Sequence, residues 1–240
     1  PAGPTFSSGI VELEVYPETD FTERFLGATI AIPANGTKAL TLALCFGDDS
    51  VKTTARAAAL AAHPDALSAH AKEYAQWFEK FAPRFYAPDP QMQKMWVYRW
   101  FVARYNLAEI GIGNLKEPAF YEGRQYYSRV IQYSTPHILD ETRWLRDSRF
   151  AYGHINNLVA SQFKGAAGKF DGEFPFLYVN SRSDLWYINW IDMAAWGVYK
   201  THPRAEFFST IAPALERNLR GMVAKYDGDH DYLYKLGGVD

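Results

Sequence analysis

The chain has 240 residues, of which 48% are hydrophobic and 16% aromatic, and its formal net charge at pH 7 is −2. This length and apolar content allow a sizeable core and one or two domains. The nearly balanced charge argues against nucleic-acid binding, and there is no apolar run of about eighteen residues that would span a bilayer. The sequence therefore predicts neither a nucleic-acid partner nor a membrane partner.

The first 48 residues carry the signals of β-strands. Residues 10–16 alternate apolar and polar side chains, and residues 25–32 and 40–46 are apolar, partly β-branched runs. Residues 33–36, Pro-Ala-Asn-Gly, favour a tight turn between these runs. Because two or three strands alone are only marginally stable, we expect residues 1–48 to be the edge of a β-sandwich that strands further upstream complete.

Helical patterns begin after residue 48. Residues 53–62 are rich in alanine and predict a helix, and residues 65–81 predict a second helix with one aromatic face. We interpret residues 49–86 as a helical linker. Asp89-Pro90 predicts the start of a third helix, which runs to about residue 110 and is apolar on several sides, as buried helices are.

The rest of the chain alternates helices with long loops. Residues 111–135 have no clear period and predict a long loop, which in a compact domain is usually functional or poorly ordered. Further helices are predicted over residues 147–162, 184–199 and 204–225, with a second loop over residues 165–183.

One tract stands out chemically, Glu141-Thr142-Arg143-Trp144-Leu145-Arg146-Asp147-Ser148-Arg149-Phe150. It places an aspartate among three arginines and two aromatic residues. Guanidinium groups hold hydroxyl and carboxylate groups through a fixed fork of donors, and aromatic rings stack on the apolar faces of sugars. The tract therefore suits a sugar-cleaving site, although surface ion pairs at the start of a helix would have the same composition.

Strands, a helical linker and then helices with long aromatic loops are the layout of the six-hairpin glycosidases, in which a β-sandwich precedes an (α/α)6 barrel. Residues 144–150 resemble their Trp-Asp-Ser-Phe-Phe motif at the start of a barrel helix. Gly172-Glu173-Phe174-Pro175, followed by residues 186–199, resembles their Gly-x-x-Pro loop and next barrel helix. Residues 227–240 resemble their Asp-x-Asp-Gly-Leu hairpin. The chain is similar in these features to the trehalase, mannosyl-oligosaccharide glucosidase and α-rhamnosidase groups.

The resemblance implies a mainly α fold, in which residues 87–240 form the first part of an (α/α)6 barrel that the rest of the polypeptide completes. It implies a glycoside hydrolase, of the inverting type, that acts on a plant or microbial oligosaccharide or polysaccharide. Asp147 would be the general acid, with the catalytic base outside this chain. We favour a periplasmic or secreted location for such an enzyme.

A general acid must hold a proton, which guanidinium groups directed at it would oppose. We therefore expect Arg143 to face the substrate or Glu141, and Arg149 to face solvent. Glu141 is the alternative acid. The candidate substrate-binding residues offer carboxylate, guanidinium, imidazole and indole groups: Glu122, Arg124, Glu141, Arg143, Trp144, His154, Trp186 and Asp192.

Several of these residues have an equally simple structural interpretation. Glu122 can pair with Arg124, His154 can be a core histidine with satisfied hydrogen bonds, and Asp192 can be the structural partner of an arginine. No cofactor is expected. Residues 227–231, Asp-Gly-Asp-His-Asp, begin like a calcium loop, but the twelfth position of that loop is a glycine instead of a bidentate glutamate, so a turn is favoured.

Two other functions remain open from the sequence. A polysaccharide lyase with an (α/α) toroid would need a base and groups that neutralise a uronate carboxylate, which Tyr126, Tyr127, Arg129, His154 and Asn157 can supply. A carbohydrate-binding module would hold a glycan in an aromatic cleft without cleaving it.

Overall fold

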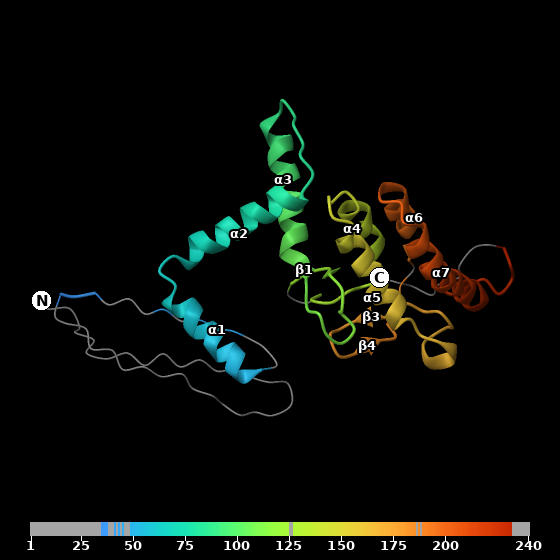
Figure 1. Ribbon diagram of the computed structural model, residues 1–240. Helices are drawn as coiled ribbons and strands as arrows, with labels where there is room; N and C mark the ends of the chain where they lie inside the picture. The colour runs from blue at the N-terminus through green and yellow to red at the C-terminus, as the bar shows by residue number, and fades with distance from the viewer. Residues whose placement is uncertain are drawn as a thin grey trace, which may run out of the picture. The chain divides into compact units, whose positions relative to one another are not determined.

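The computed structural model describes residues 35–37, 41, 43, 45, 49–124, 127–185, 187 and 189–231 (Figure 1). The chain divides into two compact units, Pro1–His70 and Ala71–Asp240. The predicted strands of residues 1–48 fall almost entirely outside the described residues, and so does the end of the hairpin expected after residue 231.

The first two helices confirm the sequence prediction. Helix α1 spans Ser50–Ala62, and Asp49 caps it, because its Oδ1 accepts hydrogen bonds from the backbone N–H groups of Val51 at 3.0 Å and Lys52 at 3.1 Å. Helix α2 spans Ala66–Phe81 and buries Trp77 and Phe81.

Helix α3 spans Pro90–Asn106 and is capped by Asp89, whose Oδ1 accepts from the backbone N–H of Gln91 at 2.8 Å. The helix ends earlier than predicted, because Leu107–Ala108 form the short strand β1, which pairs antiparallel with β2 (Ala119–Phe120). The expectation that α3 is buried on several sides is wrong, since only Trp100 and Ala103 are buried on it.

Four helices follow in the second unit: α4 (Thr135–Thr142), α5 (Arg149–Ser161), α6 (Ile191–Thr201) and α7 (Ala205–Tyr226). The predictions for α5 and α7 are confirmed. Helix α4 was not predicted, and α6 begins later than expected. Between α5 and α6 lie a short 3-10 helix, η1 (Gly165–Ala167), and the antiparallel pair β3 (Phe176–Leu177) and β4 (Arg182–Ser183).

The described residues confirm a mainly α fold, with seven α-helices and strands of two residues each. Helix α4 makes its most extensive contacts with α6, whereas α7 contacts α5 and α6 to the same extent and α5 also contacts both α4 and α6. No helix in the described part of the chain is both long and apolar enough to cross a membrane.

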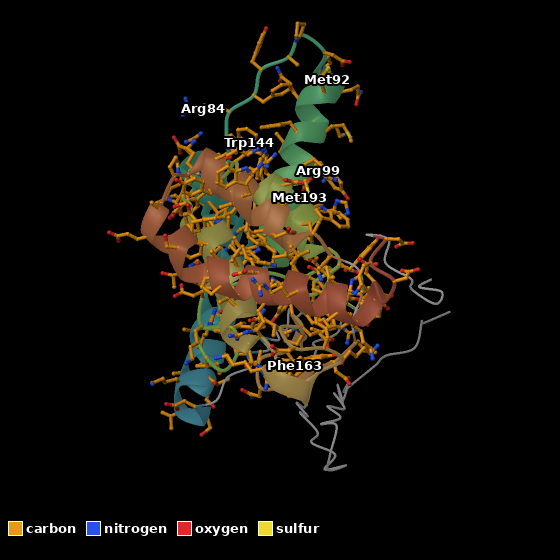
Figure 2. The ribbon with its side chains drawn as sticks, turned by 90° about the vertical axis from the view of Figure 1, so that its right-hand side faces the viewer. Arg84, Met92, Arg99, Trp144, Phe163 and Met193 are labelled. Carbon is orange, nitrogen blue, oxygen red and sulfur yellow. The ribbon has the colours of Figure 1, made fainter. Side chains whose placement is uncertain are left out.

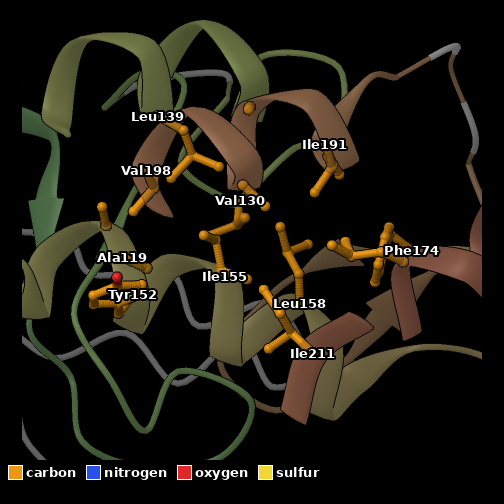
Figure 3. Packing of buried hydrophobic residues seen from close by; sticks show 14 of the residues in the cluster. Ala119, Val130, Leu139, Tyr152, Ile155, Leu158, Phe174, Ile191, Val198 and Ile211 are labelled. Carbon is orange, nitrogen blue, oxygen red and sulfur yellow. The ribbon is translucent and has the colours of Figure 1, made fainter. Parts of the chain in front are cut away.

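The largest core cluster joins helices α4 to α7 (Figure 3). Each of these helices places fully or almost fully buried aliphatic side chains into it, and burial of one such side chain contributes about 1.5–3 kcal/mol. The helical members include Leu139, Ile155, Leu158, Ile191, Val198 and Ile211.

A second core cluster is aromatic and fixes the entrance of α5 against α2 and α3. Phe150 is fully buried and its ring lies 5.0 Å from that of Phe81 and 6.0 Å from that of Trp77. Leu145 is also fully buried in this cluster. The cluster therefore holds the polypeptide on both sides of the predicted acid, Asp147, in place.

Candidate functional site

A cavity of about 430 Å³ lies between α3 and the end of α4. Its size is within the range of roughly 300–1,000 Å³ that small-molecule sites occupy. Figure 2 labels two of its lining residues, Arg99 and Trp144. The lining side chains combine indole rings with charged groups of both signs: Trp96, Arg99, Trp100, Asp140, Glu141 and Trp144.

Two helical segments position these side chains. Trp96, Arg99 and Trp100 lie at i, i+3 and i+4 in α3 and so share one face of that helix. Trp144 lies in a turn that follows α4, and its backbone N–H donates to the carbonyl oxygen of Glu141 at 3.1 Å. Leu145, the next residue, is fully buried, which anchors this turn while 54% of Trp144 stays exposed.

Each carboxylate of the cavity has an arginine partner. Glu141 Oε1 pairs with Arg99 Nη2, and Asp140 Oδ1 lies 3.0 Å from Arg143 Nη1. The side chains of Glu141 and Asp140 remain 41% and 49% exposed. Because ion pairs this exposed are worth only about 0–1 kcal/mol, an incoming ligand can separate them at little cost.

Arg143 reaches its position because of a glycine on the neighbouring helix. A Cβ atom at Gly197 of α6 would collide with Arg143 Nη1. The guanidinium also lies over the Trp144 ring, 5.4 Å from its centroid, and the Arg143 carbonyl oxygen lies 2.7 Å from His202 Nε2. Arg143 therefore faces Asp140 and supports the cavity wall, which differs from the predicted orientation toward Glu141 or a substrate.

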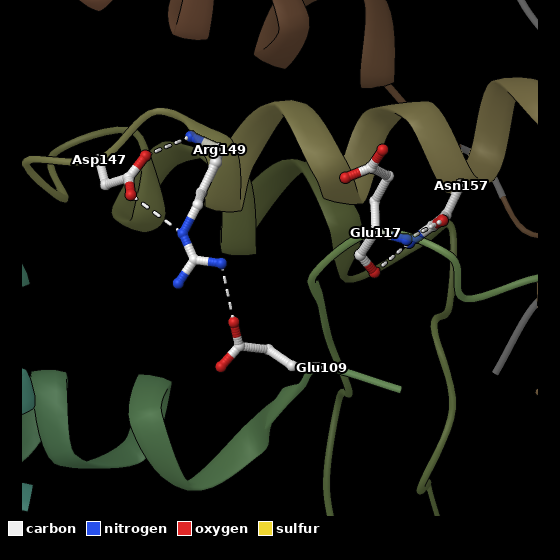
Figure 4. A network of polar contacts seen from close by, with 5 residues as sticks. All are labelled: Glu109, Glu117, Asp147, Arg149 and Asn157. Atoms are coloured by element: carbon white, nitrogen blue, oxygen red, sulfur yellow. Dashed lines mark hydrogen bonds and ion pairs between the residues drawn. The ribbon is translucent and has the colours of Figure 1, made fainter. Parts of the chain in front are cut away.

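Asp147, the predicted general acid, is not among the residues that line this cavity. Its Oδ1 accepts from the backbone N–H of Arg149 at 3.0 Å, and its Oδ2 accepts from Arg149 Nε at 2.9 Å (Figure 4). Arg149 Nη1 in turn donates to Glu109 Oε1 at 2.9 Å, and the guanidinium lies 4.4 Å from the centroid of the Phe150 ring. The expectation that Arg149 faces solvent away from Asp147 is therefore wrong.

Arg124 was predicted to bind substrate, but in the structure its guanidinium is hydrogen-bonded to the backbone. Its Nε donates to the carbonyl oxygen of Tyr105 at 2.6 Å and its Nη2 to that of Leu107 at 2.8 Å, which satisfies carbonyl groups at the C-terminal end of α3. Among the described ion pairs, none joins it to Glu122, whose backbone N–H donates to the carbonyl oxygen of Arg129 at 3.2 Å. The site thus does not include these two residues.

His154 is fully buried, and both ring nitrogens are hydrogen-bonded. Nδ1 accepts from the backbone N–H of Phe120 at 3.1 Å, so the proton is on Nε2, which lies 2.9 Å from Thr135 Oγ1. Burial lowers the pKa of His154 to about 3, which keeps the imidazole neutral. A side chain with no exposed surface cannot contact a substrate, so the burial of His154 favours its interpretation as a core histidine with satisfied hydrogen bonds.

The two remaining predicted residues lie near the start of α6. Asp192 is half-buried in the first helical turn, where a negative charge interacts favourably with the helix dipole. The sequence placed it in the middle of a helix, and this is wrong because α6 begins only at Ile191. Trp186 lies outside the described residues.

Two residues that the lyase hypothesis requires, Asn157 and His154, form hydrogen bonds within the protein. The Asn157 side chain accepts from the backbone N–H of Glu117 at 3.2 Å and donates to its carbonyl oxygen at 2.9 Å (Figure 4). His154 is buried, as described above. The Arg129 guanidinium lies 5.3 Å from the centroid of the Tyr178 ring and 5.8 Å from that of Phe176.

Glu173 is a buried carboxyl group to which the sequence assigned no chemical role. It has no exposed surface, Oε2 accepts from the backbone N–H of Lys169, and Oε1 has no hydrogen-bond partner among the described residues. Burial raises the pKa of Glu173 to about 7, against the opposing effect of the Lys169 hydrogen bond and charge. The carboxyl group therefore exchanges its proton near neutral pH.

The acidic turn after α7 brings three carboxylates together. Oxygen atoms of Asp227, Asp229 and Asp231 lie within 4.8 Å of one another, with Asp227 buried and the other two exposed. Exposed acidic groups often cluster without an ion, and the twelfth position of the calcium pattern lies outside the described residues. The turn alone does not define a cation site.

Sequence reasoning missed four of the six residues that line the α3–α4 cavity: Trp96, Arg99, Trp100 and Asp140. Trp96 and Trp100 belong to the helix that the sequence predicts to be buried, so neither is predicted to line a site. Two signals in the sequence could have identified the missed residues. One is the consecutive acids Asp140 and Glu141, and the other is the pair of tryptophans on one face of α3. In a comparison with protein-family models, no family model matches the chain.

Proposed function

We propose that the protein is a glycoside hydrolase acting on a plant or microbial oligosaccharide or polysaccharide, and that the α3–α4 cavity is its sugar-binding cleft. One observation carries this proposal: three tryptophans, two carboxylates and an arginine line a single cavity. Indole rings pack against the apolar faces of sugars, and charged carboxylate and guanidinium groups form strong hydrogen bonds with hydroxyl groups.

Glu141 is better supported than Asp147 as the catalytic carboxyl group. Asp147 is held at both oxygens by Arg149, whose guanidinium is itself anchored by Glu109 and packed on an aromatic ring. Glu141 lines the cavity and has Arg99 as its exposed ion-pair partner. A sugar that displaces Arg99 would leave Glu141 free to take up a proton from water and pass it to the glycosidic oxygen, while Asp140 accepts a hydrogen bond from a hydroxyl group.

We also propose that α3 to α7 belong to the first part of an (α/α)6 barrel. In such a barrel, helices of the inner ring alternate along the chain with helices of the outer ring, so contacts between every second helix are expected. The contacts of α4 with α6, which exceed those of any consecutive pair of helices in the described part of the chain, support this arrangement. The catalytic base would then come from a part of the polypeptide beyond these 240 residues, and inversion requires roughly 6.5–9.5 Å between the two carboxyl groups.

The proposal is tested with the whole protein and a panel of oligosaccharides. We expect new reducing ends whose anomeric configuration, followed by NMR spectroscopy, is opposite to that of the substrate. An unsaturated product that absorbs ultraviolet light would identify a lyase instead. Binding of sugars without any cleavage would leave a carbohydrate-binding module, and the proposed hydrolase would be wrong.

A further inference from the structure

A second cavity, of about 630 Å³, adjoins the α3–α4 cavity. Trp96 and Trp100 line both, so these indole rings form a wall that the two cavities share. The second cavity lies between α3 and the end of α2 with the segment that follows it, and its volume would accommodate a sugar-sized ligand.

The aromatic wall of the second cavity is braced by internal contacts. The Phe85 ring stacks on the Trp96 ring at a centroid distance of 4.8 Å and an interplanar angle of 28°. Trp96 Nε1 donates to the carbonyl oxygen of Pro83 at 2.9 Å. The indole is thus held by a hydrogen bond on its edge and by a ring on one face, which gives the cavity a pre-formed wall.

The charged groups of the two cavities have opposite balances. The α3–α4 cavity has two carboxylates, Asp140 and Glu141, and one arginine. The second cavity has two arginines, Arg84 and Arg146, and one carboxylate, Glu79. A ligand that spans both would therefore meet hydroxyl-binding acids at one end and a net positive charge at the other.

Arg146 is fixed at the second cavity by the end of α2. Its backbone N–H donates to the carbonyl oxygen of Phe81 at 2.9 Å, and its Nη1 donates to that of Glu79 at 2.8 Å. The backbone bond fixes the main chain at Arg146, and the Nη1 bond orients the guanidinium while leaving its other N–H groups for a ligand. Arg84, on the segment after α2, is exposed and lines the same cavity.

We propose that the second cavity binds the carboxylate of a uronic acid residue, next to the sugar in the α3–α4 cavity. The guanidinium fork matches a carboxylate in a bidentate manner, and Trp96 and Phe85 provide aromatic surface for the sugar ring. This inference rests on the proposed function, because it names the class of substrate: an acidic oligosaccharide.

The test compares one ligand in two charge states. Binding of an oligogalacturonide and of its fully methyl-esterified form to the whole protein is measured by calorimetry at low ionic strength. We expect the acidic form to bind at least about tenfold more tightly, and Arg84→Gln to reduce this ratio to about threefold or less. Arg220→Gln, an exposed arginine paired with Glu216 on α7, is the matched control and should leave the ratio unchanged.

We chose Arg84 for replacement because it is exposed. Arg146 is bonded to the end of α2, so its replacement could disturb the fold and confuse the result. Equal affinity for the two forms, or a ratio that Arg84→Gln does not change, overturns the uronate site. Cleavage of neutral oligosaccharides would then leave the hydrolase proposal intact. Conversely, tight acidic binding that depends on Arg84, without any cleavage, supports the uronate site and contradicts the hydrolase. If neither form binds, the uronate site is wrong.

Discussion

Arg149 contacts Asp147 at both carboxylate oxygens, through its backbone N–H at 3.0 Å and its Nε at 2.9 Å. The Asp147 carboxylate thus accepts a hydrogen bond from the first backbone N–H of α5 and pairs with the side chain of the same residue, Arg149. Arg149 also bonds Glu109, which ties the start of α5 to the segment that follows α3. The aspartate that looked catalytic in the sequence is, in the structure, part of a helix entrance.

Replacement of Asp147 by alanine should therefore affect stability. The variant loses a hydrogen bond at the start of a helix and an ion pair that is about half exposed, so we expect a cost of about 1–2 kcal/mol in the free energy of unfolding. Asp147→Asn should cost less, because an amide oxygen still accepts from the Arg149 N–H. Urea denaturation measures both. If alanine and asparagine have the same effect, the backbone hydrogen bond is not the important contact.

The exposed indole of Trp144 should contribute to sugar binding and little to stability. We expect Trp144→Ala to weaken oligosaccharide binding by about fivefold or more, which corresponds to roughly 1 kcal/mol of lost aromatic contact. The control is Trp196→Ala, since Trp196 is similarly exposed, 47% against 54%, but stacks on Tyr199 in α6 and does not line the cavity. Equal losses of affinity in the two variants would contradict the proposal that the α3–α4 cavity binds the sugar.

Glu173 should make the protein less stable as the pH rises. Its folded pKa of about 7 is above the ordinary value of 4.5, so the folded protein binds the proton more tightly than the unfolded chain. The associated stability is present below about pH 4.5 and is lost as the pH rises through 7. We expect Glu173→Gln, which stays uncharged, to be more stable than the wild type at pH 8 by an amount on the order of 2 kcal/mol. The difference should shrink at pH 5, and urea denaturation at both values checks it.

His154 should have the opposite pH dependence. The pKa of His154, about 3, lies below the ordinary value of 6.5. Between these two pH values the histidine is protonated in the unfolded chain but stays neutral in the folded protein. Stability is then retained above pH 6.5 and is lost as the pH falls toward 3, by up to about 1.4 kcal/mol per pH unit. His154→Leu should lack this component. It should also be destabilised at neutral pH by about 1–3 kcal/mol, because the Phe120 N–H loses its acceptor. An unchanged acid response in the variant would contradict this account.

Local signals allowed much of the helical structure to be predicted. Helix α1 is rich in alanine, α2, α5 and α7 have apolar residues at helical spacing, and Asp89-Pro90 marks the start of α3. Helix α4 was missed because it has only eight residues and follows a segment without a period. Short helices depend on tertiary contacts, which for α4 come mainly from α6, far along the chain.

The candidate site was less predictable than the helices. Glu141 and Trp144 were recognised from the residue types around them, but Trp96 and Arg99 join them only because α3 lies beside the end of α4. Spacing along the sequence also did not predict which arginine pairs with which carboxylate. Arg149 contacts Asp147 two positions away, whereas Arg143 turns toward α6, where Gly197 leaves room for it.

The most direct test of the central claim is the turnover number of two variants on the same oligosaccharide. The account predicts that Glu141→Gln lowers kcat by at least about a hundredfold, the usual contribution of general acid catalysis, with sugar binding largely retained. It predicts that Asp147→Asn keeps kcat within about threefold of the wild type. The reverse result, with activity lost in Asp147→Asn and kept in Glu141→Gln, would contradict the assignment of the α3–α4 cavity as the catalytic cleft.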